Sequence, residues 1–313
     1  MKHLVNDFGA DPTGQTDSTT ALQAAANYGG DIEMGEGVFL TTGFVATKPI
    51  RLLGERWNSV LLAASSMAPG TPVVLLSPDP QYGAGGYELM DFRVAPEGPT
   101  GNATAIVMAT TVAGQYLSMP KLRGLVIGQM NVNAIVSVSN NSDGLAALEI
   151  SGCVVMGGIT LNNVGDSLQI DKNIITGTNI GVFASFVPGA TAPAITRNNI
   201  TNQGGAVYLI NASQADISRN NIEHVVYGYA GGVDASVYLQ NSRMCDVRQN
   251  SINGGNQCGN VRLNNCTRTA VARNTLITQL PHKHVYTQGG YGNANTDNQY
   301  IDSSTGNEVG GYF

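Results

Sequence analysis

The stretch Ile195-Thr196-Arg197-Asn198-Asn199-Ile200 is repeated almost unchanged as Ile217-Ser218-Arg219-Asn220-Asn221-Ile222. Both copies have the form apolar-x-x-Asn-x-apolar, and they recur with others at intervals of 20 to 30 residues. Three further copies begin at Ile170, Val247 and Val271. A degenerate copy, which has Cys153 in the Asn position, precedes them. The second half of the chain is therefore an internal repeat.

A second pattern, apolar-x-Leu-x-Asn, runs in step with the first. Its best copies begin at Ile159, Val207, Val237 and Val261, and weaker ones begin at Ile106, Val136, Val182 and Val285. In the repeats at Val207, Val237 and Val261 the second pattern leads the first by ten residues. Its alternation of apolar and polar residues is typical of a half-buried strand. Each repeat therefore holds at least two strands in fixed phase.

Repeats of this length that are made of short strands predict an all-β fold, a right-handed single-stranded parallel β-helix. One coil cannot bury its apolar side chains alone, so successive coils share one elongated core. We expect the recurrent Asn to lie in a turn, because Asn tolerates the left-handed backbone conformation. The stacked Asn amides are expected to form a hydrogen-bonded ladder, and Cys153 begins it as a small buried side chain.

The open end of a β-helix needs a cover. Residues 17–26 read as a short capping helix with Asp17 as N-cap, and Gly29-Gly30 would end it. After Gly289 the chain is rich in Gly, Asn and Tyr and loses the repeat. We therefore divide the chain into a capping segment at 1–40, a β-helix at 41–290 and a C-terminal tail or cap at 291–313.

Composition excludes several classes of protein. The 313 residues include 16 basic and 22 acidic side chains, so the net charge of -6 disfavours a nucleic-acid partner. The hydrophobic content of 42% is enough for a sizeable core. No apolar run is long enough to span a bilayer, so membrane insertion is not expected. The N-terminus has no apolar region of the kind found in a secretory signal peptide.

Four cysteines, Cys153, Cys245, Cys258 and Cys266, lie in the second half of the chain at spacings that match no zinc motif. Buried reduced thiols are favoured over a disulfide. The acidic residues form no dense cluster, so we expect no metal and no cofactor. Calcium enters only if the protein is a lyase, where it would neutralise a substrate carboxylate.

The N-terminal residues resemble a known family. Asn6-Asp7-Phe8-Gly9-Ala10, the segment 14–25 and the segment 29–37 are similar to the N-terminal signature of the pectate-lyase-like superfamily. Members include pectate lyases, polygalacturonases, alginate epimerases and bacteriophage tailspike depolymerases. The family's catalytic motifs are mostly missing. Asn295-Thr296-Asp297 spells a polygalacturonase tripeptide, but it lies in the tail and is treated as a coincidence. No catalytic residue is carried over by motif.

Within that family the chain looks most like a bacteriophage tailspike. This resemblance implies a homotrimer that acts on a bacterial capsule or O-antigen polysaccharide, located in the virion tail or outside the cell. The chain is shorter than tailspikes, and it lacks an obvious virion-binding head and a clear trimerisation domain.

Outward positions on the second pattern predict a binding surface. The residue after the first apolar residue points away from the core, and reading it coil by coil gives Thr160, Phe183, Tyr208, Tyr238, Arg262 and Tyr286. Aromatic faces at this spacing suit stacking on sugar rings. The alternatives are a contact between subunits or plain surface.

Glycoside hydrolysis typically needs two carboxyl groups. Asp216 and Asp246 hold the same position on adjacent coils, about one strand spacing apart, which approaches the geometry of retaining enzymes. The alternative is that each carboxylate pairs with a neighbouring Arg. Both interpretations stay open.

The longest insertion in the repeat runs from Glu223 to Asp234 and leads into the strand that bears Tyr238. Long loops on rigid scaffolds often carry catalysis. Glu223 is the preferred acid, Asp234 the preferred base or nucleophile, and His224 a substrate contact. The alternative is a polar loop without function.

One position of the first pattern, two residues after its first apolar residue, forms a basic row: Lys172, Arg197, Arg219 and Arg273. It suits an acidic polysaccharide, or it only balances neighbouring acids.

Three functions remain. The first is a glycan depolymerase, a hydrolase in preference to a lyase; the second is a receptor-binding or adhesive protein without catalysis; the third is a structural trimeric fibre.

Overall fold

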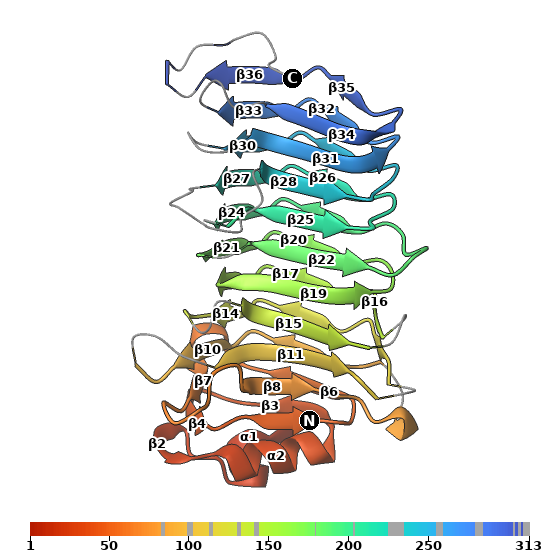
Figure 1. The fold of residues 1–313 in the computed structure, drawn as a ribbon. Helices are drawn as coiled ribbons and strands as arrows, with labels where there is room; N and C mark the ends of the chain where they lie inside the picture. The colour runs from red at the N-terminus through yellow and green to blue at the C-terminus, as the bar shows by residue number, and fades with distance from the viewer. Residues whose placement is uncertain are drawn as a thin grey trace. The chain divides into compact units, whose positions relative to one another are not determined.

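The structure is a computed structural model that describes residues 1–82, 85–98, 103–112, 115–129, 133–140, 144–178, 180–202, 204–224, 235–254, 259–278, 284–302, 304–305 and 308. Contacts divide the chain into two compact units, residues 1–163 and 164–313. Each unit is a stretch of parallel β-helix with three sheets (Figure 1). We call the sheets N1 to N3 in the first unit and C1 to C3 in the second.

Sheets N1 to N3 are built from short parallel strands. N1 comprises β1 (Lys2–His3), β3 (Gly30–Glu33), β6 (Ile50–Leu53), β9 (Glu88–Met90), β13 (Lys121–Arg123) and β17 (Glu149–Ser151). N2 comprises β2 (Thr13–Asp17), β4 (Gly37–Thr41), β7 (Ser59–Ala63), β10 (Arg93–Pro96), β14 (Val126–Ile127) and β18 (Val154–Met156). N3 comprises β5 (Phe44–Ala46), β8 (Pro72–Leu76), β11 (Thr104–Thr110), β15 (Asn133–Ser139) and β19 (Gly158–Val164), with β12 (Leu117–Ser118) and β16 (Leu145–Ala146) beside them.

Sheets C1 to C3 have the same construction. C1 comprises β20 (Gln169–Asp171), β23 (Ala194–Thr196), β26 (Asp216–Ser218), β29 (Asp246–Arg248), β32 (Ala270–Ala272) and β35 (Ala294–Thr296). C2 comprises β21 (Ile174–Gly177), β24 (Asn199–Asn202), β27 (Asn221–His224), β30 (Ser251–Asn253), β33 (Thr275–Thr278) and β36 (Gln299–Asp302). C3 comprises β22 (Val182–Phe186), β25 (Val207–Ile210), β28 (Ala235–Gln240), β31 (Gly259–Thr267) and β34 (Val285–Tyr291). The predicted parallel β-helix is confirmed.

Among the residues that the structure describes, the helical elements lie in the first unit. α1 (Leu4–Phe8) and α2 (Thr19–Tyr28) lie at its N-terminal end, and Figure 1 shows both beneath β3. Two short 3-10 turns, η1 (Arg56–Asn58) and η2 (Pro80–Tyr82), complete the unit. α2 buries Ala21, Leu22 and Ala25 as the sequence predicts.

The start of α2 corrects one prediction. The cap residue is Ser18 rather than Asp17. The Ser18 N–H is bonded to the carbonyl of Leu40, which holds residue 18 against β4. The Asp17 carboxylate still accepts a hydrogen bond from the Thr19 N–H at 2.9 Å, so it satisfies one of the free amides of the first turn.

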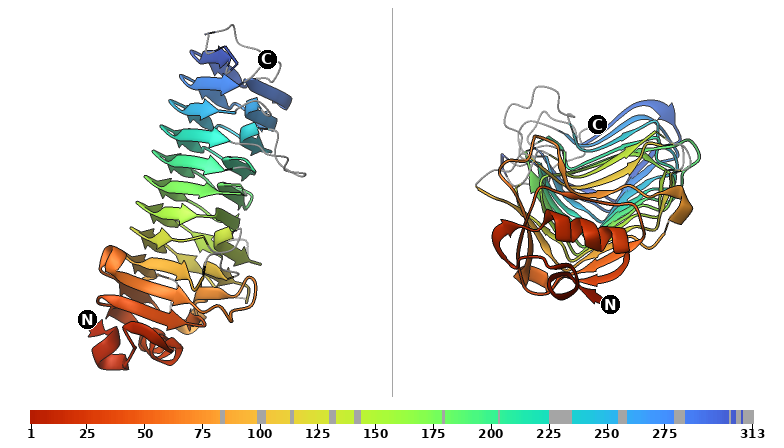
Figure 2. Two further views of the ribbon diagram at one scale, coloured as in Figure 1. Left: turned by 90° about the vertical axis from the view of Figure 1, so that its left-hand side faces the viewer. Right: turned by 90° about the horizontal axis from the view of Figure 1, so that it is seen from below.

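The core of the second unit is a stack of identical positions. In C1, Ile195 pairs with Ile217 and Ile217 with Val247, and all three are fully buried. Successive coils are stacked in the same way along the unit, as the left view of Figure 2 shows. Burying one such side chain contributes about 1.5–3 kcal/mol. The repeat in the sequence is therefore a repeat in the core.

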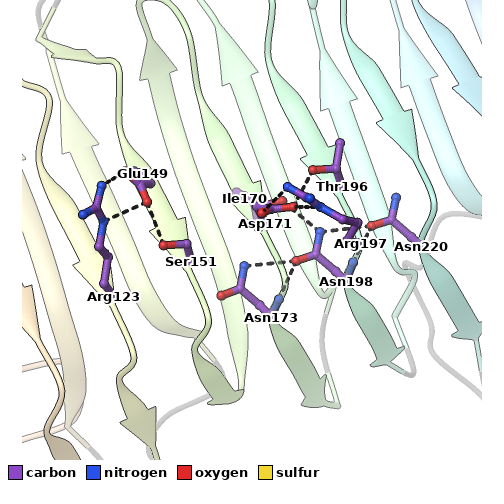
Figure 3. A network of polar contacts seen from close by, with 10 residues as sticks. All are labelled: Arg123, Glu149, Ser151, Ile170, Asp171, Asn173, Thr196, Arg197, Asn198 and Asn220. Atoms are coloured by element: carbon purple, nitrogen blue, oxygen red, sulfur yellow. Dashed lines mark hydrogen bonds and ion pairs between the residues drawn. The ribbon is translucent and has the colours of Figure 1, made fainter.

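The predicted Asn ladder is present. The backbone N–H and the side-chain amide of Asn198 both donate to Oδ1 of Asn220, at 2.9 and 3.0 Å. The same two bonds join Asn173 to Asn198, Asn220 to Asn250 and Asn250 to Asn274. Each interior amide also donates to a carbonyl of the coil before it, for example Asn220 to Ile195 at 2.8 Å. Part of the ladder is drawn in Figure 3.

The backbone conformation of these Asn residues differs from the prediction. The left-handed residue of the turn is the one before the ladder Asn, such as Arg197 (φ 57) and Arg219 (φ 58). Left-handed Asn residues occur instead at the end of the second pattern, for example Asn211 (φ 60) and Asn241 (φ 51). The side chain of the ladder Asn must lie inside the coil to bond to its neighbours. The backbone therefore changes direction at the residue before it.

The ladder also extends beyond the predicted repeat. Asn274 donates to Oδ1 of Asn298 at 2.8 Å from its backbone and 2.9 Å from its amide. β35 and β36 pair in parallel with β32 and β33. Residues 294–302 thus form part of a further turn of the β-helix within the predicted tail. The three-part division of the chain stays a prediction.

The cysteines that the structure describes are buried and free. They are Cys153, Cys245 and Cys266; Cys258 lies outside the described residues. Burial raises the pKa of the Cys153 thiol to about 12 and that of Cys245 to about 11, and it raises the pKa of Cys266 as well. Cys153 is 1% exposed, in agreement with the predicted role of a small core side chain.

Candidate functional site

The predicted outward row of C3 is present in the second unit. Phe183, Tyr208, Tyr238, Arg262 and Tyr286 occupy one register position on five successive strands, and we call this row the aromatic stripe. Each of the five side chains is half-buried. The apolar residues before and after Tyr238, Val237 and Leu239, are fully buried. The alternation of the strand therefore presents these side chains on the outer face.

The members of the aromatic stripe are in contact with one another. The rings of Tyr208 and Tyr238 are stacked with centroids 4.6 Å apart, and Phe183 meets Tyr208 edge to face at 5.3 Å. The guanidinium of Arg262 lies 5.2 Å from the ring centre of Tyr238 and 5.3 Å from that of Tyr286. These separations are typical of favourable aromatic pairs and cation–π contacts. The stripe is therefore a continuous surface.

A second row of polar side chains lies beside the stripe, two residues further along each strand. The hydroxyl of Tyr208 donates to Gln240 at 2.6 Å, and the amide of Asn264 donates to the hydroxyl of Tyr238 at 2.9 Å. Arg262 donates to Gln288 at 2.9 Å. We call Gln240, Asn264 and Gln288 the amide row. Its bonds hold the side chains of Tyr208, Tyr238 and Arg262 in place.

Together the two rows have the chemistry of a carbohydrate surface. Aromatic faces cover the C–H faces of sugar rings, while amides and hydroxyls exchange hydrogen bonds with sugar hydroxyls. Partial burial raises the pKa of Tyr208, and the neighbouring Tyr238 adds to this effect while Arg262 opposes it. Tyr208 therefore stays a neutral hydroxyl donor at neutral pH.

Sequence reasoning missed the amide row. The alternation that identified Tyr238 also places Gln240 on the same face, since residues i and i+2 of a strand share a face. The signal was therefore available, but a row of Gln and Asn is common on surfaces, and only the bonds to the tyrosine hydroxyls and to Arg262 connect it with the stripe.

Asp216 and Asp246 are adjacent, as predicted. They are register partners on β26 and β29 of C1. Asp216 is half-buried and accepts two hydrogen bonds from Arg248, at 3.3 and 3.2 Å. The pairing with a neighbouring Arg, one of the two open interpretations, is therefore present for Asp216. A catalytic role for the two carboxylates stays a prediction.

The preferred catalytic pair falls partly outside the described structure. Glu223 is exposed on β27 of C2, where it lies between Thr201 and Asn253 in the register. His224 ends the same strand. Asp234 and the rest of the insertion, 225–234, lie outside the described residues. The predicted pairing of Glu223 with Asp234 remains a prediction.

The basic row lies on the turn that connects C1 with C2. Arg197 makes two hydrogen bonds with Asp171, at 2.7 and 2.6 Å, and Thr196 donates to the same carboxylate at 2.7 Å (Figure 3). Partial burial raises the pKa of Asp171, but the contacts with Arg197 and Thr196 outweigh it, so the pKa lies below its usual value. Some of these cations therefore balance neighbouring acids, as one interpretation predicted.

No group of three or more metal-binding side chains is found among the residues that the structure describes. In the same part of the chain no helix is both long enough and apolar enough to cross a membrane.

The comparisons with known proteins show a shared fold. No protein-family model matches the chain. A DFA-I-forming inulin fructotransferase from Arthrobacter globiformis is 29% identical over 124 residues, which cover 38% of this chain and 30% of that protein. The match therefore spans less than a third of the curated relative.

Solved structures match over nearly the whole chain. The Dettilon tailspike protein has a TM-score of 0.67 at 13% identity and covers 96% of this chain and 62% of its own. The adhesin PfbA of Streptococcus pneumoniae has a TM-score of 0.61 at 14% identity and covers 96% and 91%. Tailspike protein 2 of bacteriophage CBA120 has a TM-score of 0.56 at 13% identity and covers 98% and 44%. The resemblance to tailspike β-helices is confirmed at the level of the fold.

Proposed function

We propose that this protein binds a polysaccharide along the aromatic stripe and cleaves it as a glycoside hydrolase. The observation that supports the proposal is the stripe itself, five side chains in one register position that contact one another and are bordered by amides that bond to three of them. Strands repeat every 4.7–4.9 Å, so the surface can follow an extended chain of sugars over several coils. A single small ligand would not need such a length of identical positions.

For the cleavage step we propose Glu223 as general acid and Asp234 as base or nucleophile. Protonation of the glycosidic oxygen by Glu223 would release the leaving sugar, while Asp234 activates a water or attacks the anomeric carbon. The exposure of Glu223 supports access to a polymer. Asp216 and Asp246 form the second candidate pair, and His224 is proposed as a substrate contact.

The proposed substrate is a bacterial surface polysaccharide, either capsule or O-antigen. The similarity to tailspikes supports this class, together with a homotrimeric assembly and a location in the virion tail or outside the cell. The match to a fructotransferase adds inulin to the polymers to be tested. Light scattering on the purified protein would give three times the 32.7 kDa chain mass for the trimer, and a monomer would contradict that part of the proposal.

A second candidate function is adhesion without cleavage. The ion pair of Asp216 with Arg248 occupies one candidate catalytic carboxylate. The structural match to the adhesin PfbA, which covers 91% of that chain, also favours it. Under this alternative the stripe binds the same class of polymer, and the carboxylates only balance charge.

The experiment is an activity scan over purified capsule and O-antigen polysaccharides and inulin. Reducing ends and the ultraviolet absorbance of unsaturated uronates are followed together. Reducing ends alone support the hydrolase. Both signals together would indicate a lyase, and the dependence of its activity on calcium would then be measured. A glycan that is retained by the protein but gives neither signal would contradict the enzyme and leave the adhesin.

Substitution of Tyr238 by Ala tests the binding surface. Tyr238 stacks on Tyr208, lies beneath Arg262 and accepts a bond from Asn264, so its loss should weaken polysaccharide binding about tenfold or more. Tyr291→Ala is the matched control, because Tyr291 is 68% exposed and lies outside the stripe. Isothermal titration or affinity electrophoresis measures both, and an equal effect of the two changes would contradict the proposal.

Substitution of Glu223 by Gln tests the catalytic step. The amide keeps the shape of the side chain but cannot supply a proton, so kcat should fall about 100-fold or more while polysaccharide binding persists. Glu55→Gln, a change of an exposed carboxylate in the first unit, should leave kcat unchanged. Undiminished kcat in Glu223→Gln would exclude Glu223 as the acid.

A further inference from the structure

A polar surface pocket of about 300 Å³ opens on the C1 side of the second unit, on a sheet that does not carry the aromatic stripe. Three successive coils contribute to it: β23 with its turn, β26 with its turn, and β29. Its lining consists of Thr196, Arg197, Asp216, Ser218, Arg219 and Arg248. The pocket therefore combines three guanidinium groups with one carboxylate and two hydroxyls.

The turn itself does not explain why arginines stand here. Arg197 and Arg219 have the left-handed backbone conformation, which is most easily adopted by glycine. At the corresponding turns of the first unit the left-handed residues are Asp91 (φ 55), Gly124 (φ 61) and Gly152 (φ 62), and none of them is a cation. Long cations at this position of the second unit thus run against the backbone preference, and two of them, Arg197 and Arg219, line the pocket.

The positive charges of the pocket are only partly balanced. Arg197 is bonded to Asp171 and Arg248 to Asp216. Arg219 donates to the neutral amide of Gln249 at 3.2 Å and takes part in no ion pair among the residues that the structure describes. Asp246, the register partner of Asp216, also acts on Arg248 and raises its pKa, after the larger effect of Asp216. Arg219 therefore retains an unbalanced charge at the pocket.

We infer that this pocket binds the carboxylate of an acidic sugar unit, a hexuronate, in the polysaccharide that the stripe binds; the identity of the polymer rests on the proposed function. A guanidinium presents a planar pair of donors that matches a carboxylate. Ser218 and Thr196 place hydroxyls beside it for the hydroxyls of the sugar. A pocket of this volume is at the small end of ligand sites and suits one sugar unit. The site is a second contact, on a different sheet from the stripe.

The test uses the whole protein, labelled with nitrogen-15, and follows the Nε–H resonances of its arginines. Sodium glucuronate, glucose and sodium sulfate are titrated separately at constant ionic strength. We expect glucuronate to shift the signals of Arg197, Arg219 and Arg248 saturably, while glucose leaves them in place. Because a charge-assisted hydrogen bond is lost, Arg219→Gln should weaken glucuronate binding about tenfold. Arg273→Gln, which changes the same turn position outside the pocket lining, is the matched control and should bind like the native protein.

Three outcomes would overturn the inference. They are the absence of a saturable shift with glucuronate, an equal loss in Arg219→Gln and Arg273→Gln, and sulfate that binds more tightly than glucuronate, which would indicate a site for inorganic anions. The proposed function is tested separately, since retention of a polysaccharide by the stripe and its loss in Tyr238→Ala do not depend on this pocket.

Discussion

At the scale of the residue, the amides of the ladder carry an unusual load of hydrogen bonds. Asn220 accepts two bonds from Asn198 on one side, donates two to Asn250 on the other and donates another to the carbonyl of Ile195. It is 2% exposed, so water cannot replace these partners. The ladder therefore locks each turn to the turns before and after it.

Replacement of Asn220 by Ala should destabilise the protein. The change removes the acceptor that the backbone N–H and the side-chain amide of Asn198 share, and it removes the amide donor to the Ile195 carbonyl, at a cost of about 1–3 kcal/mol. Asn221→Ala, next to it in sequence but on the exposed face, should change the free energy of unfolding by about 0.5 kcal/mol or less. Urea unfolding measures both, and equal losses would show that the ladder adds nothing beyond an exposed amide.

At the scale of the element, α2 covers the edge of a sheet. β5 is the terminal strand of N3, and the side-chain amide of Gln23 in α2 makes two bonds with the backbone of Val45 in that strand. Its oxygen accepts from the N–H and its nitrogen donates to the carbonyl, each at 2.9 Å. One side chain thus takes the place of a neighbouring strand and blunts an edge that could pair with another chain.

Replacement of Gln23 by Ala should expose this edge. We expect the free energy of unfolding to fall by about 1–3 kcal/mol, because two backbone groups of Val45 lose their partner, and we expect aggregation on heating to increase. Gln15→Ala is the control, since Gln15 is exposed and lies outside α2. Light scattering during a thermal ramp reads the aggregation, and identical curves for the two variants would refute the role assigned to Gln23.

At the scale of the whole molecule, few charges are available, and several are used in ion pairs between adjacent coils. Arg123 bonds to both carboxylate oxygens of Glu149 in the first unit, as Arg197 does to Asp171 in the second (Figure 3). These bonds from Arg123 hold the pKa of Glu149 below its ordinary value of 4.5, with partial burial opposing. The pKa of Asp171 also lies below its ordinary value, 3.8.

This arrangement sets the direction of the acid response. A carboxyl group with a lowered pKa in the folded state contributes stability above its unfolded value and loses it as pH falls towards the folded value. The double change Glu149→Gln and Asp171→Asn should therefore cost about 1 kcal/mol at pH 6, a small value because both pairs are partly exposed. The difference from the native protein should shrink below pH 4.5. Chemical unfolding from pH 3 to 7 measures the difference in free energy of unfolding, and 1 M NaCl should reduce it. A difference that grows as the pH falls would contradict the predicted direction of the effect.

The sequence by itself determined the architecture, because a β-helix repeats its contacts. An apolar or Asn residue that recurs at one position of each repeat must lie above its copies, so the core, the Asn ladder and the aromatic stripe followed from the spacing. Even the tail residue Asn298 obeys this rule, although its repeat was too weak to recognise.

Only the tertiary structure decided the partners of polar side chains at the surface. The carboxylate of Asp216 lies beside that of Asp246 and within the neighbourhood of several arginines. Its bond to Arg248 depends on how far that side chain reaches from one coil to the next. The same holds for Gln23 on Val45 and for the three arginines that share one pocket. Periodicity fixes which residues are stacked, because the backbone repeats from coil to coil. It does not fix how long, flexible side chains turn, since that depends on the particular neighbours each one meets.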